Sequence, residues 1–245
     1  MHGNDPGPDC NKLLQALPRE DFELLVPHFV FVQLAQGTVL FEPSEQVDEI
    51  YFPLSGMVSK LFVMRNGMAI ETATVGREGV VGAMAVLGQH PSRVRAIAQL
   101  PMFASRISAT QFRKAAEASN PVANLCIRYN EVLLEQARIT AACNALHSIE
   151  ARFCRWLLEI RRRAESDTIM LTQQHLSEML GVRRTSVTEV ARKMQSDGVI
   201  SYSRGVIKVL DVEALRAMAC ECYETVREQT CWQRGPLSGV RSVPH

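Results

Sequence analysis

The hydrophobic pattern first separates a β-rich segment from the rest of the chain. Between about residues 31 and 108, short apolar runs are separated by turn signals. Examples are the runs 29–34, 50–54 and 57–64. Asn66-Gly67 predicts a hairpin with a type I′ turn, which requires positive φ at both central residues. Short strands at a spacing of about 8–12 residues are typical of antiparallel barrels and sandwiches. We therefore predict an α+β protein that begins with an antiparallel β-roll, a jelly-roll-like domain.

A short helix over residues 110–118 and then a long helix are predicted next. Asn120 is a common type of N-cap residue, and Pro121 fits the first helical position. The apolar positions of the long helix recur with a period of 3.5, at Leu125, Tyr129, Val132, Gln136, Ile139, Cys143 and Leu146. Such a strict repeat favours pairing with a symmetry-related copy, with Gln136 setting the register. The alternative is a helix that lies across the β-domain.

The next helix is predicted to start at Ser148. Its apolar positions are Phe153, Trp156, Leu157 and Ile160, and it ends in Arg161, Arg162 and Arg163. The C-terminal end of a helix favours cations, and runs of charge are commonly exposed. We therefore expect these three arginines to form a solvated helix end.

Residues 172–195 contain two short helical patterns separated by a glycine. Thr172 is expected to cap the first helix, and Gly181 stands where the chain leaves that helix in a left-handed conformation. The expected buried positions are Leu176, Met179 and Leu180 in the first helix, and Val187, Val190 and Met194 in the second. Ser177 is small where the helices must cross. Together these features predict a helix-turn-helix.

The second helix presents polar side chains on the face opposite Val187 and Val190. In a helix-turn-helix the N-terminal half of this helix enters the major groove. Arg pairs with guanine, Glu accepts from cytosine, and Thr can do either or contact a thymine methyl group. We therefore predict base reading by Arg184, Thr185, Thr188 and Glu189. The predicted phosphate contacts are Thr172, Gln173, Gln174, Arg183, Ser186, Arg192 and Arg204.

A hairpin follows, with apolar runs at 199–203 and 206–210 around a turn at Arg204-Gly205. A hairpin in this place predicts the wing of a winged helix. Asp211 is expected to cap a last helix that holds Leu215 and Met218. The predicted boundaries are 12–119 for the β-roll, 120–147 for a dimerisation helix, 148–222 for the winged helix-turn-helix and 223–245 for a flexible tail.

Positive charge is concentrated in one segment of the chain. Residues 147–208 carry 11 basic and 7 acidic side chains, a net charge of +4. Residues 1–146 carry 12 basic and 14 acidic side chains, a net charge of −2. Residues 209–245 carry 4 basic and 5 acidic side chains, a net charge of −1. A basic segment between two slightly acidic ones indicates a localised polyanion contact.

The cysteines indicate a reducing compartment. The seven cysteines are irregularly spaced, form no CxxC pair, and have no histidine nearby at metal-ligand spacing. We therefore expect no metal site and no cofactor. His28, His90 and His147 are interpreted as surface or packing residues. Cys143 and Cys154 are considered as redox sensors, but buried thiols usually behave as small hydrophobes. The polar start of the chain and the lack of a run of about 20 apolar residues predict a cytoplasmic protein without membrane contact.

The chain resembles the Crp/Fnr family, the cyclic-AMP receptor protein and its relatives, over about residues 12–220. The motifs are Leu171-Thr172-Gln173-Gln174-His175-Leu176 through Gly181, Thr185-Ser186-Val187, Asp197-Gly198-Val199-Ile200, and the β-rich segments 50–56 and 76–82. The resemblance implies a β-roll sensor, a dimerisation helix and a winged helix. It also implies activation through RNA polymerase. Family members commonly have Arg where this chain has Glu189, so the usual half-site is not expected.

The effector residues of the family are not retained. Cyclic-nucleotide binders place Glu after the glycine matched by Gly82, where this chain has Ala83. They then use Arg-Ser for the cyclic phosphate; Arg93 is present, but the Ser position is Val94. The Thr-Ser pair that contacts the base falls at Ala137-Arg138. Each unpaired polar group of a ligand costs about 1–3 kcal/mol. The resemblance therefore implies a possible effector pocket at Gly82, Ala83, Arg93 and Val94 that does not take cyclic AMP.

The sequence thus predicts a homodimeric, sequence-specific transcription regulator that binds a palindromic site on double-stranded DNA, with no identified effector. The alternative is a small-molecule-sensing β-roll module with weak or vestigial DNA binding. An enzyme is disfavoured, because the sequence has no nucleophile–base pair, and residues 76–82 lack the Lys-Ser/Thr ending of a phosphate-binding loop.

Overall fold

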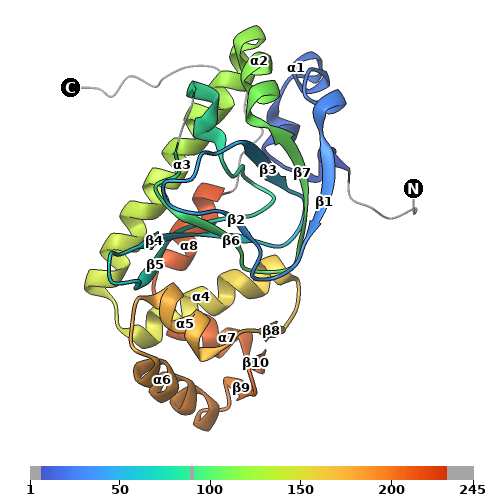
Figure 1. Cartoon of the computed structure of the whole chain (residues 1–245). Helices are drawn as coiled ribbons and strands as arrows, with labels where there is room; N and C mark the ends of the chain where they lie inside the picture. Colours follow the sequence, from blue (N-terminus) through green and yellow to red (C-terminus); the bar gives the residue numbers. More distant parts are fainter. Residues whose placement is uncertain (1–6, 89–90, 231–245) are drawn as a thin grey trace, which may run out of the picture.

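The computed structural model describes residues 7–88 and 91–230, which form a β-rich N-terminal part, a long helix and a smaller C-terminal part (Figure 1). This architecture confirms the predicted fold class. The predicted roles of His90 and of residues 231–245 fall outside the described residues. No helix in the described residues is both long and apolar enough to cross a membrane.

The N-terminal part is a β-roll made of two antiparallel sheets. Its strands are β1 (Val30–Leu34), β2 (Val39–Phe41), β3 (Glu49–Pro53), β4 (Val58–Val63), β5 (Ala69–Val75), β6 (Arg95–Ala98) and β7 (Met102–Ser108). One sheet has the order β1-β7-β3 and the other β2-β6-β4-β5. The short helices η1 (Pro8–Cys10), η2 (Leu14–Ala16), α1 (Arg19–Glu23) and η3 (Val26–His28) precede β1, and η4 (Ala83–Leu87) lies between β5 and β6.

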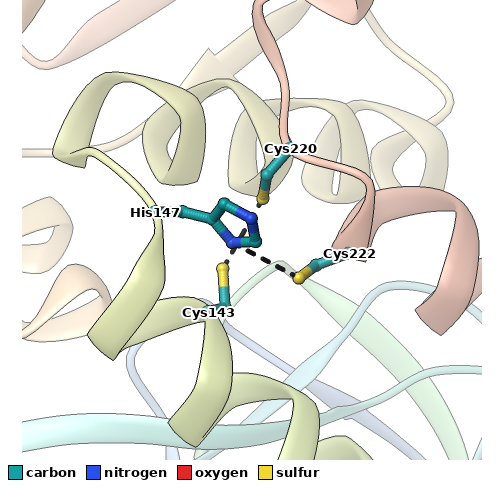
Figure 2. Close-up of side chains that lie close together, drawn as sticks. All are labelled: Cys143, His147, Cys220 and Cys222. Atoms are coloured by element: carbon teal, nitrogen blue, oxygen red, sulfur yellow. Dashed lines mark hydrogen bonds between the residues drawn. The ribbon is translucent and has the colours of Figure 1, made fainter.

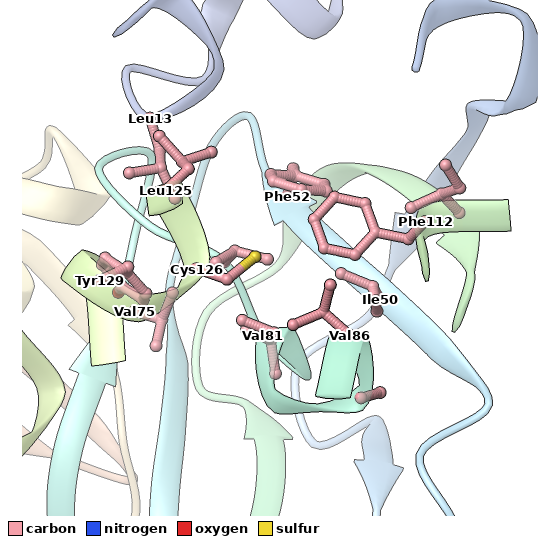
Figure 3. Close-up of a cluster of buried hydrophobic side chains, with 14 of the residues drawn as sticks. Leu13, Ile50, Phe52, Val75, Val81, Val86, Phe112, Leu125, Cys126 and Tyr129 are labelled. Carbon is pink, nitrogen blue, oxygen red and sulfur yellow. The ribbon is translucent and has the colours of Figure 1, made fainter. Parts of the chain in front are cut away.

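Alternating side chains of both sheets fill the core of the roll (Figure 3). Phe52 lies at its centre, with its ring centroid 5.6 Å from Phe29 and 5.7 Å from Phe112, both in edge-to-face contact. Phe112 comes from α2 (Ala109–Ala118), which Ser108 caps. Cys126 is also buried here, and burial raises the pKa of its thiol to about 12. This thiol is therefore a packing residue.

The hairpin between β4 and β5 does not have the predicted type I′ turn. Gly67 has a φ of +82°, but Asn66 is not among the residues with positive φ. The N–H of Gly67 donates to the Met64 carbonyl, and the N–H of Met64 donates to the Met68 carbonyl. The loop therefore has three residues with glycine in the left-handed position, the next most common class of hairpin.

The long helix α3 spans Asn120–Leu146. Its N-cap is one residue before the predicted cap. The Oγ atom of Ser119, not Asn120, caps it by accepting from the Val122 N–H at 3.2 Å. Pro121 lies in the first turn as expected.

The predicted dimer seam of α3 is largely wrong. Leu125, Tyr129, Gln136 and Cys143 are each at most 6% exposed within this single chain, so they face its own core. The heptad-like repeat therefore reflects a helix that packs along the β-roll, which was the alternative interpretation. Val132 and Ile139 are half-buried, and Leu146 is 79% exposed.

The C-terminal part begins with α4 (Ile149–Ala164), which the Ser148 side chain caps. The winged helix-turn-helix follows: β8 (Thr168–Met170), α5 (Gln173–Leu180), α6 (Arg184–Ser196), β9 (Ile200–Ser203), β10 (Val206–Val209) and α7 (Val212–Met218). The sheet order is β8-β10-β9. A final helix, α8 (Cys222–Thr230), buries Tyr223 and Val226, so the prediction of a flexible tail from residue 223 is wrong for residues 223–230.

The two parts of the chain share one hydrophobic core. Met57, Leu61 and Leu100 of the β-roll are in the same buried cluster as Trp156 and Leu157 of α4. That cluster continues through the buried faces of α5 and α6 into the wing. Helix α4 thus joins the β-roll and the winged helix-turn-helix.

Buried polar groups accompany this shared core. On β5, Glu71 accepts a hydrogen bond from Ser59 Oγ at 2.5 Å and from Trp156 Nε1 at 3.0 Å. Thr74 donates to Glu159 of α4 at 2.5 Å. The group extends to Arg155, Arg163, Glu78 and Gln136.

Arg163 corrects the prediction of a solvated arginine run. Its side chain is 4% exposed and lies 2.8 Å from Glu78 and 3.4 Å from Glu159. Arg161 pairs with Asp167 at 2.5 Å. Arg162 is exposed as expected.

Candidate nucleic-acid interface

The helix-turn-helix is held by local features that the sequence predicts. Thr172 Oγ1 accepts from the His175 N–H at 3.2 Å, which starts α5. Gly181 ends it with a φ of +62°, and a Cβ there would lie 2.5 Å from Ile70 Cδ1 on the β-roll. The left-handed turn therefore favours glycine, and any larger residue would also displace the end of the Ile70 side chain.

Helix α6 buries one face and exposes the other. Val187, Ala191 and Met194 are buried. Arg184, Thr185 and Glu189 are exposed, and Thr188 is half-buried with its hydroxyl donating to the Arg184 carbonyl at 2.9 Å. The four residues predicted to read bases thus lie on the N-terminal half of one exposed helix at the lower end of the molecule (Figure 1).

A hollow of about 470 Å³ lies between α6, the N-terminus of α5 and the wing. Of the predicted DNA contacts it is lined by Thr172, Gln173, Arg184, Thr188, Arg192 and Arg204, and Tyr202 lies among them. The structure therefore brings together six predicted contacts from three separate elements. Thr185 and Glu189 lie on α6 outside this hollow, and Ser186 is half-buried.

A tight turn between β9 and β10 positions the side chain of Arg204. Arg204 has a φ of +50° and Gly205 a φ of +78°, so both central residues of the β9–β10 turn are left-handed. This is the arrangement of a two-residue hairpin that follows the strand twist. It places Arg204 at the tip of the wing, as the sequence predicts.

Three cations of this surface are free to meet an anion. Among the residues that the structure describes, no carboxylate pairs with Arg184, Arg192 or Arg204. Lys193 differs, because its Nζ lies 2.7 Å from Glu150. Three arginines without a carboxylate partner among the described residues therefore border the hollow.

Two predicted phosphate contacts lie elsewhere. Gln174 and Arg183 line a cleft of about 650 Å³ between the helix-turn-helix and the β4–β5 hairpin. Gln174 Nε2 donates to Glu178 at 2.6 Å. Arg183 is the N-cap of α6 and makes no capping hydrogen bond. These two residues border the β-roll and not the hollow.

The predicted effector residues lie around one cavity in the β-roll. It measures about 180 Å³, and Gly82, Ala83, Arg93 and Val94 all line it. From α3 it receives Asn130 and Leu133, whereas Ala137 and Arg138 are not among its lining residues. Sequence reasoning missed Lys60, which also lines the cavity and whose pKa burial lowers to about 8. Among the described residues no carboxylate pairs with Lys60.

A thiol cluster corrects the prediction of no metal-ligating group. Cys143, His147, Cys220 and Cys222 offer ligand atoms that all lie within 4.8 Å of one another (Figure 2). A hydrogen bond from Cys220 lowers the pKa of the Cys143 thiol, and the same contact raises the pKa of Cys220. Two local signals were present: the i,i+4 spacing of Cys143 and His147, and the Cys-x-Cys at 220–222. Cys154 lies apart, and burial raises the pKa of its thiol to about 12.

The fold and the hollow together define a winged-helix DNA-binding protein with an N-terminal β-roll domain. Family models match the same two parts: the cyclic nucleotide-binding domain over residues 31–119 and the Crp-like helix-turn-helix domain over residues 151–218. The chain belongs to the Crp/Fnr family of DNA-binding transcription regulators. No curated protein sequence matches the chain.

Solved structures share this fold at low sequence identity. A protein assigned to the Crp/Fnr family from Eubacterium rectale is 18% identical, with a TM-score of 0.71 over 86% of this chain and 98% of that one. The c-di-GMP-responsive regulator CLP of Xanthomonas campestris is 16% identical, with a TM-score of 0.66 over 79% and 100%. FixK2 of Bradyrhizobium japonicum is 17% identical, with a TM-score of 0.65 over 78% and 98%.

Proposed function

We propose that this protein is a homodimeric transcription regulator that reads a palindromic DNA site with α6. The observation that carries the proposal is the hollow in which Arg184, Arg192 and Arg204 converge without carboxylate partners among the described residues. Arg184, Thr185, Thr188 and Glu189 read bases. Thr172, Gln173, Ser186, Arg192 and Arg204 contact phosphates, which fix position without specifying sequence.

The proposed dimer forms through the face of α3 that is turned away from the β-roll. On this face Ile127 and Leu134 are 51% and 49% exposed, one heptad apart, and Ala141 occupies the next heptad position. Exposed apolar residues at heptad spacing are the usual contacts between paired helices. A two-fold axis along α3 would present two copies of α6 to successive major grooves, about 34–36 Å apart.

Cyclic AMP is not the proposed effector. Ala83 offers no carboxylate to a ribose, and the cavity of about 180 Å³ is smaller than the roughly 300–1,000 Å³ of typical ligand sites. We propose that the protein acts in the cytoplasm as an activator that contacts RNA polymerase. Family membership supports this part of the proposal, by analogy alone.

The test is selection of bound sequences from random duplex DNA with the purified full-length protein and with Glu189→Ala. The expected result is a palindromic motif whose preference relaxes at one symmetric pair of positions in the variant. A lost base contact reduces discrimination by about 1–3 kcal/mol. Glu117→Ala, which removes an exposed carboxylate on α2, is the matched control and retains the wild-type motif.

Phosphate contacts are tested separately by salt dependence. Arg204→Ala is expected to weaken binding to all sequences alike and to reduce the slope of log K against log[salt] by about 1 per subunit. An unchanged slope would remove Arg204 from the interface. Failure of the wild-type protein to enrich any sequence, with and without cell extract, would refute the DNA-binding proposal.

A second candidate function follows from the cavity around Lys60 and Arg93. Two cations at a small cavity favour a compact anion as the ligand of a sensing module. If sensing were the main function and DNA binding vestigial, small anions would raise the thermal stability of the protein while no DNA sequence was enriched. Lys60→Met would then abolish the shift.

A further inference from the structure

Four potential metal ligands meet where the sensor helix joins the DNA-binding domain. Cys143 lies in the last turn of α3 and His147 follows that helix, while Cys222 begins α8 and Cys220 lies two residues before it. Their side chains point toward a common centre (Figure 2). No part of the proposed DNA-reading surface includes them.

The spacing of the ligand atoms fits a single tetrahedral ion. With metal–sulfur bonds of about 2.3 Å, the edge of a tetrahedron of ligands is about 3.8 Å. Cys143 Sγ and Cys220 Sγ are 3.5 Å apart, and Cys222 Sγ is 3.7 Å from His147 Nδ1. All four ligand atoms lie within 4.8 Å of one another. In an iron–sulfur cluster the thiolates bind different irons, so the sulfur atoms would lie farther apart.

The imidazole of His147 is already oriented as a ligand. Its Nδ1 atom faces Cys222, and its Nε2 atom lies 3.1 Å from a carboxylate oxygen of Glu221. Metal-binding histidines almost always donate their second ring N–H to a carboxylate, a carbonyl or water, which fixes the tautomer and the ring orientation. Glu221 is therefore a positioning residue, placed between the two cysteines of the Cys-x-Cys segment.

The surroundings suit an anionic metal–thiolate group. Cys143 is fully buried and the other two thiols are 7% exposed, with Ile139 and Ala151 packed against them. The side chains of Arg152 and Arg155 interact electrostatically with the cluster, and the buried Nε atoms of both have no hydrogen-bond partner among the described residues. Three thiolates around a divalent ion carry a net charge of −1, which these guanidinium groups offset.

We propose that Cys143, His147, Cys220 and Cys222 bind one divalent ion of the zinc class in a tetrahedral Cys₃His site. Thiolate and imidazole ligands select zinc over magnesium or calcium. Four protein ligands leave no open position, so the site is structural. Each cysteine releases its thiol proton as it binds the ion.

The position of the site gives the ion a defined role. Its ligands flank residues 148–219, which include the whole helix-turn-helix. The ion would tie the end of α3 to α8 and so fix the connection at His147 and Ser148 through which α3 reaches α4. Metal binding would thereby hold the DNA-binding domain against the sensor helix.

The experiment uses the full-length protein, metal-free and reduced, with Cys231→Ser to remove the one thiol outside the described residues. Titration with Co²⁺ is followed by absorption spectroscopy, and Zn²⁺ then competes. The expected result is one Co²⁺ per chain, thiolate-to-cobalt charge-transfer bands and the intense visible bands of tetrahedral cobalt. Zn²⁺ is expected to displace the cobalt.

Matched variants assign the ligands. Cys222→Ser and His147→Ala are each expected to weaken Co²⁺ binding at least about 100-fold, and Glu221→Gln to weaken it about 10-fold with an unchanged spectrum. Cys10→Ser, at a half-buried thiol outside the cluster, retains wild-type affinity. Circular dichroism of the metal-free proteins verifies that each variant is folded.

Three results would overturn the proposal. The first is the absence of thiolate charge-transfer bands, and the second is equal binding by Cys222→Ser and the parent protein. The third is anaerobic reconstitution with several irons and sulfides per chain, together with no stoichiometric cobalt binding. None of these depends on DNA binding, so failure of the metal proposal is separate from failure of the regulator proposal.

Discussion

Replacement of Glu71 by Gln changes a carboxyl group buried between the β-roll and α4. Glu71 is 6% exposed, and it accepts hydrogen bonds from Ser59 and Trp156. Burial raises the pKa of this carboxyl to about 7, and the nearby charge of Glu159 adds to the shift. A glutamine retains an acceptor for Trp156 and a donor for Ser59, but it cannot ionise.

The size of the effect follows from the difference in pKa between folded and unfolded chains. Between the unfolded value of 4.5 and the folded value of about 7, the native protein binds more protons at this site than the unfolded chain. The unfolding free energy therefore falls as pH rises through this window. At 1.36 kcal/mol per pKa unit, the loss approaches about 3 kcal/mol. Glu71→Gln is expected to match wild type near pH 4.5 and to exceed it by about that amount at pH 8.

The assay is urea unfolding at a fixed protein concentration from pH 5 to pH 8, followed by tryptophan fluorescence. The difference between wild type and variant isolates Glu71 from other titrating groups. A difference that stays constant across this range would refute the argument. Glu159→Gln is the comparison: burial raises the pKa of Glu159, but Arg163 and Arg155 outweigh it and lower the value overall. That variant should therefore lose stability at neutral pH.

Three other substitutions test the local geometry. Arg183→Thr supplies the missing cap of α6 and should raise the unfolding free energy by about 1 kcal/mol in urea; no gain would show that the cap is already satisfied. Gly79→Ala places a Cβ 1.8 Å from Tyr129 Oη and should cost about 2–3 kcal/mol, whereas a loss under 1 kcal/mol would mean that the tyrosine moves aside. Leu134→Glu should shift the protein from dimer to monomer in sedimentation velocity, while Leu87→Glu, at another exposed leucine, should not; a retained dimer would exclude this face of α3.

Features set by local chemistry could be predicted from the sequence. Thr172, Gly181 and Asp211 act through neighbouring backbone groups, and they begin or end their helices as predicted. The turn at Arg204-Gly205 depends on two adjacent residues and is also confirmed. The prediction of the α3 cap was wrong because Ser and Asn are both favoured N-cap residues, and local preference does not distinguish Ser119 from Asn120.

Features that depend on distant partners could not be predicted. The period of 3.5 along α3 indicates a buried stripe but not what covers it, and here the β-roll covers Tyr129 and Gln136. Arg163 was predicted to be exposed because its partner Glu78 is 85 residues away in the sequence, where no local pattern connects the two. The thiols of Cys143 and Cys220 are 77 residues apart in sequence, so neither half of the cluster points to the other.

The core shared by the two domains limits how an effector could act. Pulling the DNA-binding domain away would expose Met57, Leu61 and Leu100, at about 1.5–3 kcal/mol for each side chain. Such a displacement would cost on the order of 5–9 kcal/mol. An effector would then have to bind the separated form roughly 10⁴- to 10⁶-fold more tightly merely to populate the two forms equally. A shift of α4 along the sheet that keeps these three side chains buried avoids this cost, whereas a rigid separation of the two domains does not.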